Sequence, residues 1–189
     1  MQIDEATRTY SAANESQHLY PEWLIAELRS DQAGETGAVA IYEGILAVTR
    51  NSDLRAFAEH HRATEQEHLA RINDLLPSKQ HSRLLPLWRV AGFLTGLLPA
   101  LFGANATYAT IQAVETFVDQ HYGHQIARLD SECLFPAVRE ILNQCRLDEV
   151  SHRDEAGERL KEQPSVMLRL WCAMVGRGSS YAVVLARIF

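Results

Sequence analysis

The 189-residue chain is 47% hydrophobic and 22% charged, a globular composition that excludes disordered and low-complexity classes. Its net charge of −6 argues against nucleic-acid binding. Three cysteines without a C-x-x-C spacing, and an N-terminus without a basic flank and apolar run, predict reduced thiols in a cytoplasmic compartment and no signal peptide.

Residues 1–21 are polar and aperiodic, which predicts an N-terminal arm followed by a single domain over residues 22–189. Apolar residues at intervals of three and four predict four long helices, over about 23–50, 54–75, 108–129 and 136–160. Asn51 is a candidate N-cap, and Pro136 suits a first helical turn. Because no strand pattern of useful length is present, the fold class is expected to be all-α.

Two further segments are strongly apolar. Residues 84–104 contain two prolines and three glycines, which is too interrupted for a membrane-spanning helix, so a broken apolar hairpin is predicted there. Residues 166–188 mix apolar side chains with arginines and predict a C-terminal amphipathic helix.

Glu-x-x-His occurs three times, although random placement of these residues gives only about 0.7 occurrences. Glu15 with His18 lies in the polar arm and is assigned to chance. The other two pairs lie on apolar helix faces, and each follows a lone core-facing glutamate about one helical hairpin upstream. These residues are Glu35, Glu65 and His68 in the first half and Glu115, Glu149 and His152 in the second.

Buried carboxylates need cations or hydrogen-bond donors, and the apolar stripes hold no basic partner. The alternative, a set of buried salt bridges to arginine or lysine, is therefore disfavoured. Oxygen and imidazole ligands suit iron or manganese, and two Glu-x-x-His pairs with two lone glutamates form the ligand set of a four-helix di-iron site. Asp148 is a candidate partner for the second nitrogen of a ligating histidine, or else a solvated surface acid. Tyr42 and Tyr122 each follow a lone glutamate by seven residues, which indicates two related hairpins.

The stretches DQAGETGAVAIYEG, EQEHL, PLWRVAGFLTGLLPALFG, AVETFVDQHYGHQI and RLDEVSHRDEA resemble the demethoxyubiquinone hydroxylase family of ubiquinone biosynthesis, in order from about Arg29 to the C-terminus. The resemblance implies a ferritin-like di-iron monooxygenase that uses O2 to hydroxylate the ring of a polyprenylated methoxy-benzoquinol. The family's iron ligands fall on the same six residues. His121 and Tyr122 match a His-Tyr pair that the family uses near substrate and iron.

The chain departs from the family at Gln32 and Ile45, where the family has His and Gln, which leaves the hydroxylated ring position open. No G-x-G-x-x-G motif opens a helix after a strand, so an external two-electron donor is implied, either NADH or a partner protein. The lipid tail of such a substrate implies peripheral attachment to the cytoplasmic side of a bacterial inner membrane. Segments 84–104 and 166–188 have the composition of such an interfacial element, with core or dimer contact as the alternative.

An accessory protein of ubiquinone biosynthesis and a homo-oligomer are further candidate partners. Two rival functions stay open at this point. One is iron storage or peroxide detoxification on the same ferritin-like scaffold. The other is a non-enzymatic helical bundle that packs against a membrane partner.

Overall fold

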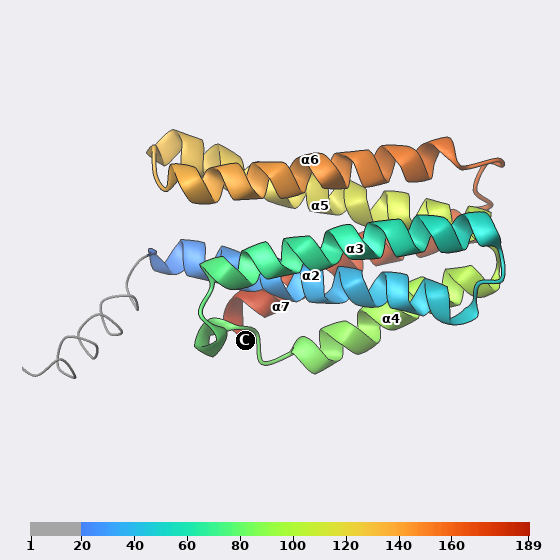
Figure 1. Cartoon of the computed structure of the whole chain (residues 1–189), viewed down its shortest axis with the longest axis horizontal. Helices are drawn as coiled ribbons and strands as arrows, with labels where there is room; N and C mark the ends of the chain where they lie inside the picture. The colour runs from blue at the N-terminus through green and yellow to red at the C-terminus, as the bar shows by residue number, and fades with distance from the viewer. Residues whose placement is uncertain (1–19) are drawn as a thin grey trace, which may run out of the picture.

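The computed structural model describes residues 20–189, so most of the predicted arm, including Glu15 and His18, lies outside the described residues. Within residues 20–189 every regular element is a helix, which confirms the all-α prediction (Figure 1). The elements are α2 (Glu22–Val48), α3 (Ser52–Leu75), the short 3-10 helix η2 (Ser78–Gln80), α4 (Leu85–Leu101), α5 (Ala104–Glu132), α6 (Pro136–Glu158) and α7 (Val166–Ile188).

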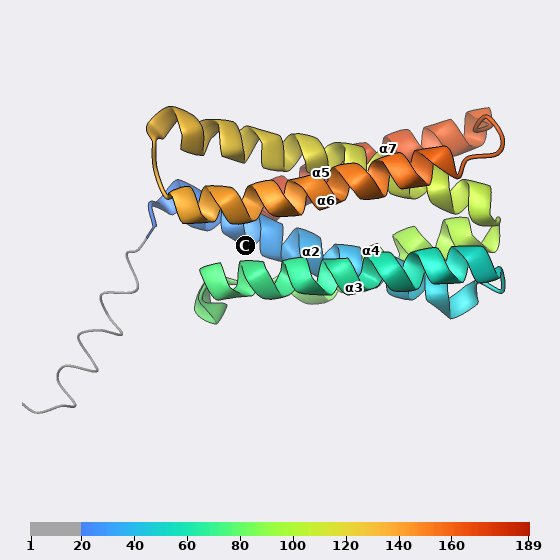
Figure 2. The same ribbon diagram turned by 45° about the horizontal axis from the view of Figure 1, so that its top comes forward.

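The four long helices form a bundle of two hairpins, as predicted. Helices α2 and α3 make the first hairpin and α5 and α6 the second, and α3 faces α6 across the bundle (Figures 1 and 2). Helix α4 packs against α2, and α7 packs against α5 and α2 on the side away from α3 and α6. The predicted N-cap and first-turn proline are confirmed as well. Asn51 Oδ1 accepts a hydrogen bond of 2.9 Å from the Leu54 amide, and Pro136 is the first residue of α6.

The bundle core consists of two apolar clusters with a polar layer between them. One cluster lies around Leu28, Ile72 and Leu142, and the other lies around Ile45, Phe57 and Ile111. On every helix of the bundle the buried glutamate falls between the residues of these two clusters. Each cluster therefore closes one end of the polar layer against water.

The apolar segment 84–104 was predicted to be a broken hairpin, and in the structure the chain breaks only near the end of this segment. Helix α4 is continuous through its glycines, and the chain turns only at Phe102 and Gly103, where Gly103 has a φ of 105°. The glycines allow close contact with α2, since a Cβ at Gly96 would lie 1.8 Å from the carbonyl oxygen of Ile41. The predicted break is therefore present at Gly103, whereas Gly92 and Gly96 lie inside a continuous helix and serve helix packing.

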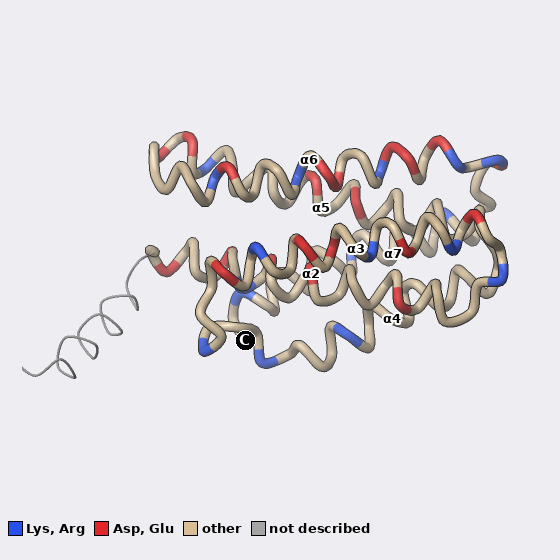
Figure 3. Tube along the Cα trace, viewed as in Figure 1, with Lys and Arg blue, Asp and Glu red and all other residues tan. Residues whose placement is uncertain are grey.

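Helices α4 and α7 differ from the bundle in charge and exposure. They contain no acidic residue, whereas α2, α3, α5 and α6 carry both signs of charge (Figure 3). Many of their large apolar side chains are exposed, including Val90, Met167, Leu170 and Tyr181. None of the helices within residues 20–189 is both long and apolar enough to cross a membrane.

Candidate metal centre

The six residues selected by spacing come together in the middle of the bundle, and all are at least 96% buried. They form two overlapping groups of four, and in each group the potential ligand atoms lie within 4.8 Å of one another. The first group is Glu35, Glu65, His68 and Glu149, and the second is Glu65, Glu115, Glu149 and His152. Glu65 and Glu149 belong to both groups, so each could supply ligand atoms to two ions.

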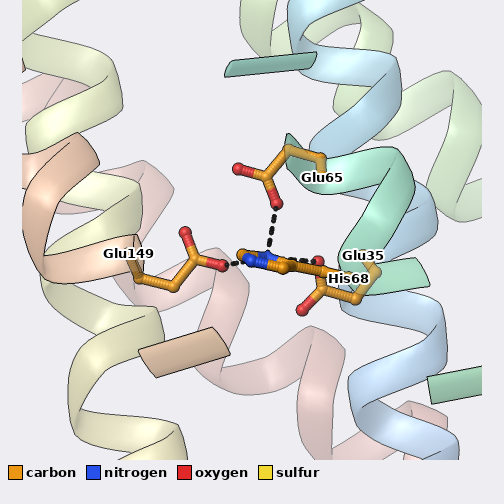
Figure 4. Close-up of side chains that lie close together, drawn as sticks. All are labelled: Glu35, Glu65, His68 and Glu149. Atoms are coloured by element: carbon orange, nitrogen blue, oxygen red, sulfur yellow. Dashed lines mark hydrogen bonds and ion pairs between the residues drawn. The ribbon is translucent and has the colours of Figure 1, made fainter. Parts of the chain in front are cut away.

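His68 lies at the centre of the first group (Figure 4). Its Nδ1 atom is 3.0 Å from Glu149 Oε1, 3.5 Å from Glu65 Oε2 and 3.8 Å from Glu35 Oε2. In the second group, Nδ1 of His152 is 3.1 Å from Glu65 Oε1 and 3.3 Å from Glu149 Oε2. Both imidazoles therefore direct the same nitrogen at the shared carboxylates.

The donor set fits a pair of divalent cations. Among residues 20–189, no arginine or lysine forms an ion pair with any of the four glutamates. Oxygen atoms of Glu35, Glu65 and Glu149, together with His152 Nδ1, are buried without a hydrogen-bond partner in the described part of the chain. Four carboxylates carry four negative charges, which two divalent ions would balance with both imidazoles neutral.

Without metal, the imidazoles hold the compensating charge. Burial lowers the pKa of His152, but the carboxylates of Glu149 and Glu65 outweigh burial and raise it to about 10. The same causes hold the pKa of His68 well above its usual range. Burial raises the pKa of Glu65, yet His152 and His68 outweigh it and lower this pKa to about 2. A metal ion would therefore have to displace protons from the imidazoles.

The two lone glutamates are bound by tyrosines from the opposite hairpin. Tyr42 on α2 donates a hydrogen bond of 3.4 Å to Glu115 on α5, and Tyr122 on α5 donates to Glu35 on α2. Burial, with the charges of neighbouring carboxylates, raises the pKa of both glutamates and of both tyrosines well above their usual values. The tyrosines therefore stay protonated and orient the carboxylates.

Asp148 contacts the imidazole of the other hairpin. Its Oδ2 atom accepts a hydrogen bond of 3.0 Å from His68 Nε2, which leaves Nδ1 of His68 directed at the cluster. No equivalent carboxylate reaches Nε2 of His152 within residues 20–189. The ring of His61 packs against His152 instead, with centroids 4.1 Å apart, and its Nε2 lies 3.0 Å from Glu155 Oε2. Sequence reasoning placed His61 on the apolar stripe but did not single it out.

His121 lies beside the metal cluster in a polar network that sequence reasoning missed. Its Nε2 is 2.9 Å from the buried Asp31 Oδ1, and Gln125 donates a hydrogen bond of 2.7 Å to the same oxygen. Ser30 Oγ is 3.3 Å from His121 Nε2. Asp31 lies on the same helical stripe as Glu35, and the spacing of these two acids could have indicated a second buried carboxylate.

A cavity of about 390 Å³ connects this network with the metal cluster. Helices α2, α4, α5 and α7 line most of it with apolar and small side chains, and α6 contributes Glu149. Three cluster carboxylates and both members of the His121–Tyr122 pair border the cavity. The Nε1 atom of Trp88, another lining residue, is buried and has no hydrogen-bond partner within residues 20–189. This space suits an apolar ring with a few polar substituents.

The family described as "Ubiquinone biosynthesis protein COQ7" matches residues 22–186. A "3-demethoxyubiquinol 3-hydroxylase" of Rhodospirillum rubrum is 41% identical over 130 residues, 67% of this chain and 60% of that protein. A "NADPH-dependent 3-demethoxyubiquinone 3-hydroxylase, mitochondrial" of Dictyostelium discoideum is 38% identical over 128 residues, 66% of this chain and 59% of that protein. The rat protein of the same description is 31% identical over 166 residues, 86% of this chain and 76% of that protein. The chain thus matches about 60% of the length of the first two relatives.

Proposed function

Because the chain belongs to the COQ7 family of ubiquinone biosynthesis proteins, as its motifs predicted, we propose that it hydroxylates the ring of a polyprenylated demethoxyubiquinol with O2. One observation carries the proposal, namely a buried cluster of four glutamates and two histidines that borders an apolar cavity. The cluster supplies the ligands for a redox metal, and the cavity supplies a dry space for an aromatic ring.

In this proposal two iron ions are held by the six cluster residues, with Glu65 and Glu149 shared between them. Bound iron supplies the redox chemistry that activates O2 for insertion of one oxygen atom into the ring. Manganese suits the same donors, so metal analysis of protein purified from its native host identifies the ion. The chain's own contribution is to orient the carboxylates through Tyr42 and Tyr122 and to exclude water with the two apolar clusters.

His121 orients the ring in this proposal. Because His121 donates its Nε2 hydrogen to Asp31, its Nδ1 atom is the hydrogen-bond acceptor available to a ring hydroxyl. The buried carboxylate of Asp31 also stabilises positive charge on the imidazole if a substrate proton is transferred to it. Tyr122 borders the same cavity and donates a hydrogen bond to Glu35, so in this proposal it lies between the ring and a metal ligand.

The two departures from the family do not reach the substrate space. Gln32 and Ile45 are both buried on α2, and neither lines the cavity. The residues that do line it include the matched His-Tyr pair. This supports hydroxylation at the same ring position as in the relatives whose names specify the 3-position.

We further propose that α4 and α7 attach the protein peripherally to an anionic membrane, on the cytoplasmic side in a bacterium. Met167 and Leu170 on α7 are 80% and 67% exposed, and the helix carries arginines but no acidic residue. The cavity lies between these two helices and the bundle, so a lipid-tailed substrate enters from the membrane side. Leu170→Glu should reduce co-sedimentation with vesicles that contain phosphatidylglycerol. Leu147→Glu, at a site of α6 that is 59% exposed, should not, and equal loss in both variants would refute this orientation.

The two electrons come from an external donor in this proposal. Within residues 20–189 there is no strand, and therefore no strand–turn–helix unit for a dinucleotide. The mitochondrial relatives are named as NADPH-dependent, which makes a nicotinamide the first donor to test, with NADH and NADPH compared directly. Reduction by a partner protein alone would show that the nicotinamide acts indirectly. Light scattering with and without an accessory ubiquinone-biosynthesis protein tests for oligomers.

Quinone extraction from cells that lack the gene tests the function. The demethoxy precursor should accumulate, and the gene should restore ubiquinone and incorporate label from ¹⁸O2 into the ring. Glu149→Gln should abolish this rescue, whereas Glu158→Gln, an exposed change on the same helix, should not. Accumulation of an earlier precursor would identify a different ring position. Peroxide turnover or iron deposition, with normal ubiquinone in the deleted cells, would instead assign the chain to iron or peroxide handling.

A further inference from the structure

The two halves of the metal centre have equivalent inner donors. Each group of four contains one imidazole, one lone glutamate and the shared pair Glu65 and Glu149. Each lone glutamate receives a hydrogen bond from one tyrosine. Any difference between the two metal positions must therefore arise outside these donors.

The second nitrogens of the two imidazoles have different partners. His68 donates Nε2–H to Asp148 at 3.0 Å, whereas Nε2 of His152 has no hydrogen-bond partner within residues 20–189. A carboxylate behind a ligating imidazole fixes its orientation and makes it a stronger ligand. The ring of His61, which packs against His152, supplies no such carboxylate.

The internal repeat identifies the residue responsible for this difference. Residues of α3 and α6 correspond at an offset of 84, which relates Glu65 to Glu149 and His68 to His152. The same offset relates Asp148 to Thr64, the residue immediately before Glu65. Thr64 is half-buried on α3 and cannot supply the negative charge that Asp148 supplies on α6.

We propose that the two metal positions are unequal, and that the position at His68 binds its ion more tightly than the position at His152 because only His68 is backed by a carboxylate. Loss of such a partner lowers metal affinity by roughly 10–100-fold, which sets the expected ratio between the two positions. The ion at His152 is then the second to bind and the first to leave. This proposal rests on metal binding by the cluster and is independent of the reaction catalysed.

Mn²⁺ titration of the metal-free protein, followed by electron paramagnetic resonance, tests the proposal in two single-site variants. His152→Gln keeps the position at His68, and His68→Gln keeps the position at His152, so the two variants are matched in chemistry. The first should bind one Mn²⁺ roughly 10–100-fold more tightly than the second. Equal affinities, or the reverse order, would overturn the proposal.

Two changes outside the metal ligands provide a test that leaves both imidazoles intact. Asp148→Asn should weaken the tighter of the two binding phases of the otherwise native protein, whereas Thr64→Asp should strengthen the weaker phase. If Asp148→Asn weakens both phases alike, or Thr64→Asp changes neither, the carboxylate is not the source of the difference. Circular dichroism of each variant confirms folding. Failure of the native protein to bind any Mn²⁺ or Fe²⁺ would refute the metal centre itself, and with it both this proposal and the proposed function.

Discussion

Replacing Gly96 with alanine should force α4 away from α2 and destabilise the protein. The new Cβ would lie 1.8 Å from the carbonyl oxygen of Ile41 and 2.7 Å from its carbonyl carbon, whereas ordinary contact begins at 3.4 Å. Both are main-chain atoms of a helix, so no side-chain rotation relieves the overlap. Overpacking costs about 1–3 kcal/mol, and a backbone clash falls at the upper end. Alanine regains about 1 kcal/mol of helix propensity, which leaves a net loss of about 2 kcal/mol.

Urea unfolding of the metal-free protein, followed by circular dichroism, measures this loss as a lower midpoint at unchanged slope. Gly176→Ala on α7 is the matched control, because no atom lies within 4 Å of its Cβ, and it should gain up to about 1 kcal/mol. Gly44→Ala tests the same contact from α2, since its Cβ would lie 2.1 Å from the Phe93 carbonyl oxygen. If Gly96→Ala were as stable as the native protein, the close approach of α2 and α4 would be refuted.

Three further predictions concern the site. The pKa of His152 is raised from 6.5 in the unfolded chain to about 10, which stabilises the metal-free protein fully below pH 6.5 and progressively less as the pH rises through 10, so the melting temperature of the metal-free protein should fall over that range. An unchanged melting temperature would contradict the pairing of His152 with Glu65 and Glu149. Trp88→Phe removes the unpartnered indole N–H donor in the cavity, so it should raise KM for the quinol roughly 2–10-fold while the free energy of unfolding stays within about 0.5 kcal/mol. An unchanged KM would show that the indole does not contact the substrate. Ala182→Phe should fill part of the cavity and raise KM for the quinol by roughly tenfold or more without loss of bound metal. Loss of metal would show that the substitution disturbs the metal cluster and not only the substrate cavity.

The sequence was sufficient to predict the helical bundle and the convergence of its charged core residues. A spacing of three places Glu65 and His68 on one helix face, and an apolar surrounding indicates which face is buried. Periodicity does not give side-chain direction, however. His61 lies on the same stripe, one turn before Glu65, and yet its ring turns toward Glu155 and packs edge-on against His152.

These sequence patterns could not predict contacts between helices that are distant in sequence. Gly92 and Gly96 indicate a helix break when read alone, because glycine is a poor helix former. Their function becomes evident only once α2 is known to lie against them, with Gly37 and Ile41 at the points of closest approach. The cavity likewise depends on where α7 packs, which no local pattern specifies.

Each hairpin supplies the tyrosine that binds the lone glutamate of the other hairpin, and this limits how such a centre can form from two separate hairpins. Helices α2 and α3 alone contain one lone glutamate, one Glu-x-x-His pair and one tyrosine. Yet Tyr42 binds a glutamate of the other hairpin, and the glutamate of its own hairpin is bound by Tyr122. A half-length chain could therefore satisfy its own buried carboxylate only in a twofold-symmetric dimer. The full chain holds both copies at a fixed one-to-one ratio, which leaves each copy free to diverge.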